Sequence, residues 1–280
     1  MQPNRNTGRA GRLDGLDALR GVAIVMMVIF HFCFDLTYWR LAHFEMLSDW
    51  RWIGWRTLIV SLFLFLVGVS LVLGREVSER HFWRRWSLIA GSALLISLIS
   101  WLMFGERFIY FGVLHFIALA QCLGRQGLRL GWLARPVPLC LLAILCLLVG
   151  ALGFEAMNPR SLNWLGLAAS KPLTEDYVPL LPWFGVVLLG MAVGLGRSAR
   201  WPSCSLPGLT PLVWLGRHSL VVYLLHQPIL MGVLWLAVSL GGFPWRLRWL
   251  STMSPQWDGI ATVCAAISLA YPLSAEAMTT

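Results

Sequence analysis

Charged residues are scarce in this chain, and lysine is almost absent. Only 12% of the 280 residues are charged, about half of the roughly 25% that is typical of soluble domains. The 22 basic residues include one lysine, Lys171, so nearly all of the positive charge is arginine. In place of charge, 58% of the residues are hydrophobic and the mean hydropathy is +0.70. This composition excludes an ordinary soluble domain and predicts an integral membrane protein.

Cysteine motifs are missing as well. The six cysteines are scattered through apolar segments, with no C-x-x-C and no C-x-x-C-H. That spacing excludes the usual thiolate metal site and covalent haem attachment, so we expect no bound metal. The basic residues are not interleaved with aromatic residues outside the apolar runs, and we therefore expect no nucleic-acid partner.

The apolar runs predict an all-α polytopic membrane protein, a bundle of about seven to eight transmembrane helices. The predicted spans are residues 16–38, 53–73, 86–104, 108–123, 138–154, 179–196 and 218–240, with a weaker eighth at 258–273. The eighth run is short and Pro272 interrupts its end. We expect a tail at residues 1–15, one transmembrane domain at 16–240, and a C-terminal segment at 241–280 that crosses the membrane or lies along it.

The arginines predict the orientation. They gather before the first run, between the second and third, between the fourth and fifth, and after the sixth. Arginine and lysine accumulate on the cytoplasmic side of membrane proteins. The N-terminus is therefore predicted to be cytoplasmic.

The first run contains four ionisable residues, Asp17, Arg20, His31 and Asp35. On a helix of 3.6 residues per turn they fall within a sector of about 60°. About 16 Å of helix rise separates Arg20 from His31, so the four residues form an inner and an outer pair. Ionisable residues inside a membrane face protein or water and tend to mark function.

Both pairs have a simpler interpretation, because Asp17 with Arg20 and His31 with Asp35 have the helical spacing of mutually neutralising residues. For the inner pair this interpretation and a binding role remain equally open. The outer pair favours acid–base chemistry, since a carboxylate one turn away can orient an imidazole and raise its basicity.

Three further groups are candidates for a polar cavity. His115 either lines that cavity or is a hydrogen-bonded core histidine. Ser219, Tyr223 and His226 share one face of the last strong run and predict a polar wall, which in membrane bundles often only bonds neighbouring helices. In the long outer loop, the residues suited to a sugar are Trp164, Glu175 and Asp176, although aromatic residues there also serve as membrane anchors.

A family resemblance rests on these same residues. The stretch "LDALRGVAIVMMVIFHF" resembles the first-helix signature of transmembrane acyltransferases, in which an arginine precedes a histidine by ten intervening residues, here Arg20 and His31. The stretches "SLFLFLVGVSLVL", "FGVLHFIAL", "TEDYVPLLPWFGVVLLG" and "LGRHSLVVYLLHQPIL" resemble bacterial members of the heparan-alpha-glucosaminide N-acetyltransferase catalytic-domain group. The resemblance implies a cytoplasmic acyl-CoA donor, in particular acetyl-CoA, and a sugar or glycan acceptor on the other side. The chain lacks the luminal extension of the members that act on heparan, so the acceptor itself does not carry over.

We therefore predict a membrane-bound acetyltransferase, acting on nitrogen or oxygen, with membrane lipid, acyl-CoA and a glycan as partners. The resemblance to bacterial members implies a location in the bacterial inner membrane. His31 and Asp35 are the predicted catalytic residues. The predicted acyl-CoA site comprises Arg20, Asp17, Arg84 and Arg85, the last two as phosphate ligands. Arg125 and Arg129 of the next inner loop could clamp the same phosphates. Positive-inside bias alone also explains all four of these loop arginines.

Two other classes stay open. A transporter would show inverted repeats, which we do not detect. A haem-binding membrane subunit would need paired axial histidines, for which His115 and His226 are the candidates.

Overall fold

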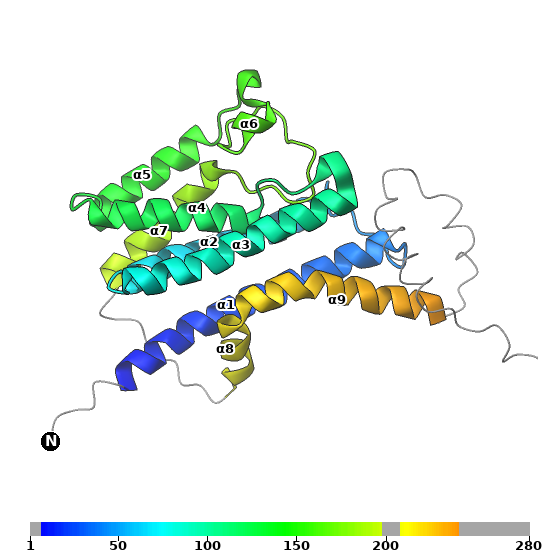
Figure 1. Ribbon diagram of the computed structural model, residues 1–280, viewed down its shortest axis with the longest axis horizontal. Coiled ribbons are helices and arrows are strands. Elements are labelled where there is room, and N and C mark those ends of the chain that lie inside the picture. The colour runs from blue at the N-terminus through cyan, green and yellow to red at the C-terminus, as the bar shows by residue number, and fades with distance from the viewer. Residues whose placement is uncertain (1–6, 198–207, 241–280) are drawn as a thin grey trace, which may run out of the picture.

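The computed structural model describes residues 7–197 and 208–240, and within these ranges the chain is helical, with only isolated bridges between extended segments (Figure 1). The helices are α1 (Thr7–Tyr38), α2 (Trp50–Leu73), α3 (Glu79–Phe104), α4 (Val113–Arg129), α5 (Pro136–Val149), α6 (Arg160–Asn163), α7 (Leu180–Arg197), α8 (Thr210–Arg217) and α9 (Ser219–Leu240). Single 3₁₀ turns lie at Gly105–Arg107 and Glu155–Met157. The all-α class is confirmed.

A helix lies at each of the seven stronger predicted spans, and the weaker run at 258–273 lies outside the described residues. Four helical segments are long and apolar enough to cross a membrane: Asp14–Tyr38, Trp50–Leu73, Glu79–Arg107 and Ser219–Leu240. Two further apolar helices, Pro136–Val149 and Leu180–Gly196, are shorter. The protein is an integral membrane protein, and the total of seven to eight crossings stays a prediction.

The predicted start of the fourth span at residue 108 was wrong, because residues 108–112 form a link that side chains of α3 hold. The backbone N–H of Ile109 donates to Ser100 Oγ over 2.9 Å, and Ser97 Oγ donates to the Ile109 carbonyl over 2.7 Å. These bonds satisfy an irregular backbone inside the bundle, so the helix begins only at Val113.

The main core joins α2, α4, α5 and α7. Leu64, Phe116, Ala143 and Val187 are completely buried there. α7 lies so close to α2 that a Cβ on Gly190 would stand 2.1 Å from the carbonyl oxygen of Phe65. Small residues allow such backbone contact between membrane helices, which packing, rather than water exclusion, must hold together.

α1, α8 and α9 form a second group that lies along the first (Figure 1). α8 packs directly on α1, since a Cβ on Gly216 would stand 1.7 Å from the Asp17 carbonyl oxygen. Ile24 and Met27 of α1 join Ile59 of α2 in a buried cluster between the groups. The two groups therefore meet along α1 and α2.

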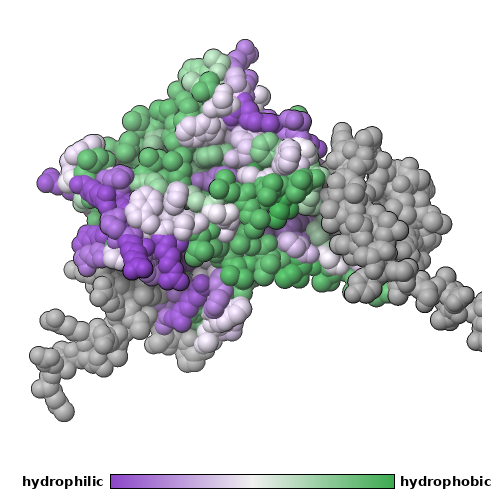
Figure 2. All heavy atoms as spheres, viewed as in Figure 1, coloured by the Kyte–Doolittle hydropathy of each residue, from purple (hydrophilic) through white to green (hydrophobic). Residues whose placement is uncertain are grey.

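The outer faces are apolar. Leu94, Leu98 and Leu102 of α3 are all more than half exposed. Figure 2 shows hydrophobic residues over much of this side, with hydrophilic residues gathered mainly at the end where α3 begins and near α6. A face of exposed leucine is the expected surface toward lipid.

Candidate active site

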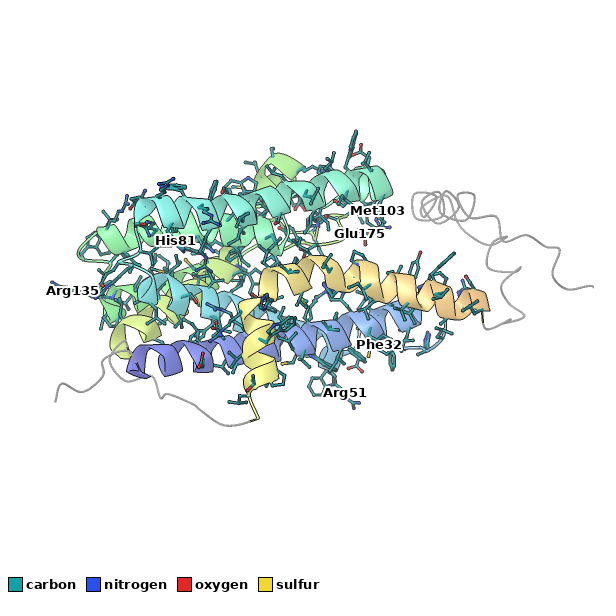
Figure 3. The ribbon with its side chains drawn as sticks, turned by 60° about the horizontal axis from the view of Figure 1, so that its bottom comes forward. Phe32, Arg51, His81, Met103, Arg135 and Glu175 are labelled. Carbon is teal, nitrogen blue, oxygen red and sulfur yellow. The ribbon has the colours of Figure 1, made fainter. Side chains whose placement is uncertain are left out.

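A cavity of about 660 Å³ opens at one end of the bundle. Six arginines line it: Arg20, Arg75, Arg85, Arg125, Arg129 and Arg217. We call this end, formed by residues 74–85, 125–135 and 217, the basic end. Figure 3 shows His81 and Arg135 toward this end and Met103 and Glu175 toward the other.

The cavity is elongated and reaches far into the bundle. Arg129 lies at one end of its lining and Val113 at the other, and these residues are about 24 Å apart along α4. Ser219 and Tyr223 of α9 face the same space. The cavity thus leads from a cationic mouth to a tyrosine within the bundle.

Arg20 stands on the cavity wall with both ends of its guanidinium occupied. Nη1 donates to Asp17 Oδ1 over 2.6 Å and Nη2 to Ser70 Oγ over 2.5 Å. Asp17 also lies 3.4 Å from Arg217, which pairs in turn with Asp14. The inner pair therefore does neutralise itself, as its simpler interpretation predicts, and it also belongs to a larger network that faces the cavity.

Of the two predicted phosphate ligands on α3, Arg85 lines the cavity, whereas Arg84 is exposed outside its lining. Arg125 and Arg129 of α4 lie at the mouth, and both contact the carboxylate of Glu79. The sequence offered Arg125 and Arg129 as phosphate ligands beside Arg84 and Arg85, and the fold brings Arg85, Arg125 and Arg129 to one cavity.

Beyond the cavity, aromatic rings connect Tyr223 to His31. The Tyr223 ring centroid is 5.9 Å from that of His226, and the His226 centroid is 4.9 Å from that of His31. His226 Nδ1 lies 2.8 Å from the Tyr223 carbonyl oxygen and so must donate its proton there. His226 Nε2 then presents a lone pair. The structure thus brings together two histidines that lie 195 positions apart in the sequence.

Asp35 does not orient the His31 ring, which corrects the predicted contact. Asp35 is 1% exposed, and its Oδ1 accepts a hydrogen bond of 2.7 Å from Gln227 Nε2. Gln227 follows His226 directly, so α9 supplies both the second imidazole and the partner of the carboxylate. The sequence reasoning missed Gln227, although the adjacent "HQP" was a visible signal.

Three buried polar atoms in this cluster have no hydrogen-bond partner within the described part of the chain. They are Asp35 Oδ2, His226 Nε2 and Gln227 Oε1. Each is a hydrogen-bond acceptor. Buried polar atoms are almost always satisfied, so three acceptors left open in one cluster indicate a place where a ligand donates. We call His31, Asp35, His226 and Gln227 the acceptor cluster.

His115 lies elsewhere and has a structural role. Its Nε2 is 2.9 Å from Ser97 Oγ, and its Nδ1 accepts from the Gly112 N–H over 3.3 Å. Because the Ser97 hydroxyl donates its proton to the Ile109 carbonyl oxygen, His115 Nε2 must be the donor in its hydrogen bond with Ser97. Both ring nitrogens are therefore engaged in the turn before α4, and neither is free to ligate a haem iron.

The candidate sugar residues of the long loop before α7 are also engaged. Glu175 pairs with Arg107 at 2.8 Å, and Trp164 donates from Nε1 to the Ser161 carbonyl over 2.9 Å. Asp176 Oδ2 accepts from the Val113 N–H over 2.8 Å and so caps α4. Burial raises the pKa of the Asp176 carboxyl, while the Val113 N–H and the charge of Lys171 partly oppose that rise.

The same loop is organised around Asn163, a residue without a signal in the sequence. Asn163 is 2% exposed. Its side-chain oxygen accepts from Tyr110 over 2.9 Å, and its carbonyl oxygen accepts from the Tyr177 hydroxyl over 2.7 Å. Burial raises the pKa of Tyr177 to about 12, and nearby Tyr110 adds to the rise.

Comparison with known families decides the class. The model of the family described as "Heparan-alpha-glucosaminide N-acetyltransferase, catalytic" matches residues 12–228. The chain belongs to this family. Comparisons with curated proteins and with solved structures found no match.

Membership in the heparan-alpha-glucosaminide N-acetyltransferase catalytic family confirms the resemblance and makes the protein a membrane acetyltransferase. It favours this class over the transporter and the haem-binding subunit. The matched range runs from α1 to the first half of α9, so it contains Arg20, His31 and His226 together. The described residues contain no cluster of three or more histidine, cysteine or acidic side chains suited to a metal ion.

Proposed function

We propose that the protein transfers an acetyl group from cytoplasmic acetyl-CoA, bound in the cavity, to the amine of a sugar or glycan on the other side of the membrane. The observation that carries this proposal is the continuity from the basic end to Tyr223, and from Tyr223 through His226 to His31. Donor and acceptor would meet where these side chains lie.

The cavity suits the donor. Its volume of about 660 Å³ lies within the roughly 300–1,000 Å³ usual for small-molecule sites. Arginine forms paired hydrogen bonds with phosphate, which makes a mouth of several arginines a fitting place for the phosphates of acyl-CoA. By the positive-inside rule the basic end is cytoplasmic, the side on which acyl-CoA is available.

The acceptor cluster suits an amine. Asp35 is a buried carboxylate whose described partner, Gln227, is neutral. A buried carboxylate without a cation is costly, and an ammonium group would supply both charge and donors. The open acceptors of His226 and Gln227 would take further protons from the same ligand. A hydroxyl brings one donor and no charge, so the cluster favours an amino sugar over a neutral sugar.

In the proposed reaction, the ammonium first loses a proton to give the neutral nucleophile. Its nitrogen attacks the thioester carbonyl, the new N–C bond forms, and the C–S bond breaks. His31 accepts the second proton as the amide forms and passes it to the departing thiolate. The products are the acetamide, free CoA and one released proton. His226, in ring contact with His31, would hold the histidine pair in place.

Radiolabelled acetyl-CoA and the purified protein test this proposal in lipid nanodiscs. We expect label in a hexosamine and none above background in the matching hexose or the N-acetylated hexosamine. Equal labelling of hexosamine and hexose would contradict the amine assignment. Label that remains on CoA with every acceptor, although the protein binds CoA, would contradict the acceptor class. Failure to bind CoA would contradict the donor.

A further inference from the structure

We infer that Glu79 competes with CoA for the Arg125–Arg129 pair. Its carboxylate occupies the two arginines until the 3′-phosphate of CoA displaces it. This inference deepens the proposed function and rests on it. In this role Glu79 sets the affinity for the donor and determines which phosphate of the donor contacts the arginine pair.

The contacts at the mouth support a displaceable carboxylate. One oxygen of Glu79, Oε1, accepts from Arg125 Nη2 over 2.7 Å and also from Arg129 Nη2. The Glu79 side chain is 54% exposed, whereas the Arg125 side chain is only 13% exposed. Arg125 is thus held in the wall, whereas Arg129, with a side chain that is 52% exposed, lies with Glu79 on the solvent side.

Arg125 is fixed for ligand binding independently of Glu79. Its guanidinium carbon lies 4.2 Å from the centroid of the Phe82 ring, and Nη2 also donates to the Val77 carbonyl over 3.2 Å. Its Nε is buried and has no hydrogen-bond partner among the described residues. A donor therefore remains that a carboxylate held at Nη2 does not reach.

The charges match a dianion better than a carboxylate. Two arginines share one Glu79, so this group of three keeps a net positive charge. Glu79 is the first residue of α3, where a negative charge is favoured by the helix dipole, and a phosphate would gain the same advantage. A phosphate monoester carries more charge and more oxygens than the carboxylate it would replace.

The position of the Arg125–Arg129 pair favours the 3′-phosphate of CoA over its other phosphates. Arg125 and Arg129 lie at the mouth, whereas the thioester must reach Tyr223 near the acceptor cluster. Along α4 the mouth is about 18–24 Å from Val113, the residue at the far end of the cavity. In an extended CoA the 3′-phosphate is at the end away from the thiol, so it falls at the mouth.

The test compares CoA with 3′-dephospho-CoA on the wild-type protein and on E79Q, by calorimetry in nanodiscs of neutral phosphatidylcholine. The glutamine keeps an oxygen for Arg125 and removes the competing charge. We expect E79Q to bind CoA roughly 2- to 5-fold more tightly, within the range for an exposed ion pair. Binding of 3′-dephospho-CoA should stay within about twofold, because that ligand leaves Glu79 in place.

E76Q is the matched control. Glu76 stands three residues before Glu79 beside the same mouth. Its carboxylate is 3.9 Å from Arg75, and within the described residues it forms no ion pair with Arg125 or Arg129. E76Q removes the same charge, so equal tightening by both variants would show a general field effect and overturn the inference. Unchanged or weaker CoA binding by E79Q would also overturn it. If the wild-type protein binds no CoA, the donor assignment fails together with the inference.

An anionic lipid headgroup is a second source of phosphate at this end. Repeating the titrations in nanodiscs that contain phosphatidylglycerol separates the sources. We expect the CoA gain of E79Q to persist there. If E79Q instead retains more phosphatidylglycerol and its CoA affinity matches wild type in both lipids, the arginine pair is a lipid site and the inference is overturned.

Discussion

The basic end and the acceptor cluster differ in whether their polar side chains have partners. At the basic end both acidic side chains lie within 4 Å of an arginine, Glu79 of Arg125 and Glu76 of Arg75. In the acceptor cluster, Asp35 contacts a neutral amide, and three buried acceptors have no partner within the described ranges.

This difference is the one expected between a region that binds a ligand and a region that carries out a reaction. Paired charges near an aqueous mouth stabilise the fold modestly and can exchange partners with an anionic ligand. Unpaired acceptors within a membrane bundle are costly in the free protein, and such strain is retained where a ligand or a proton must be taken up. On this basis we propose that the mouth binds the donor and that the cluster performs the transfer.

The largest effect should follow from His31→Ala. Loss of a general base lowers turnover by about 10²–10⁴-fold, while CoA affinity should stay near wild type, because His31 is about 16 Å along α1 from Arg20. Turnover and CoA titration in the same preparation give both values. The control is His43→Ala, an exposed histidine after α1. Near-normal transfer by His31→Ala would move the base to His226.

Asp35→Asn should come next and should depend on the acceptor. Removing the charge that the proposal places against an ammonium costs about 10–100-fold in kcat/KM for a hexosamine. The amide can still meet Gln227, so the fold should survive, and CoA affinity should not change. Steady-state kinetics over a series of hexosamine concentrations measure this effect. A loss in CoA affinity instead would erase the distinction between the two regions.

Arg20→Ala should act on the other region, with about a 10-fold loss in CoA affinity and a smaller loss in turnover at saturating donor. The effect is moderate because Arg20 already pairs with Asp17, and Arg217 remains beside that carboxylate. Arg20→Lys should restore only part of the affinity, since an ammonium cannot contact Asp17 and Ser70 in one planar geometry. Titration with CoA distinguishes these outcomes, and unchanged affinity would remove Arg20 from the donor site.

The smallest effect concerns the loop before α7 and appears only in alkali. The Tyr177 pKa is raised from 10.0 to about 12, so the folded state keeps the phenolic proton where the unfolded state has lost it. Stability should then be complete below about pH 10 and should fall as the pH rises toward 12. Tyr177→Phe should flatten this decline in thermal unfolding measured across that range. An equally steep decline in the variant would assign it to another group.

The first helix, α1, shows which contacts a sequence pattern can predict. The sector shared by Asp17, Arg20, His31 and Asp35 follows from 3.6 residues per turn, and the structure places Asp17 and Arg20 in contact as their spacing predicts. The same reasoning paired His31 with Asp35, but the hydrogen bond of Asp35 goes to Gln227 and the ring contact of His31 goes to His226, both on α9 and distant in sequence. Helical spacing shows which residues share a face, and it does not show which helix covers that face.

His115 is a second case in which the local sequence did not reveal the partners of a side chain. The sequence left it open between a cavity residue and a core histidine, since a histidine in an apolar run has no local feature that separates the two. Its partners, Ser97 and the Gly112 N–H, lie in the turn between α3 and α4. Asn163 had no signal at all, because an asparagine in a loop acquires its role only from the tyrosines folded around it.

The sequence by itself determined the membrane class, the helical fold, the positions of the seven stronger helices and the family, because hydrophobic run length, helix period and ordered motifs are local properties of a chain. Only the tertiary structure decided that six arginines from five segments surround one cavity, that His226 and Gln227 meet His31 and Asp35, and that Glu79 bridges Arg125 and Arg129. These contacts join residues far apart in the chain, and their geometry depends on how closely small residues such as Gly190 and Gly216 let the helices approach.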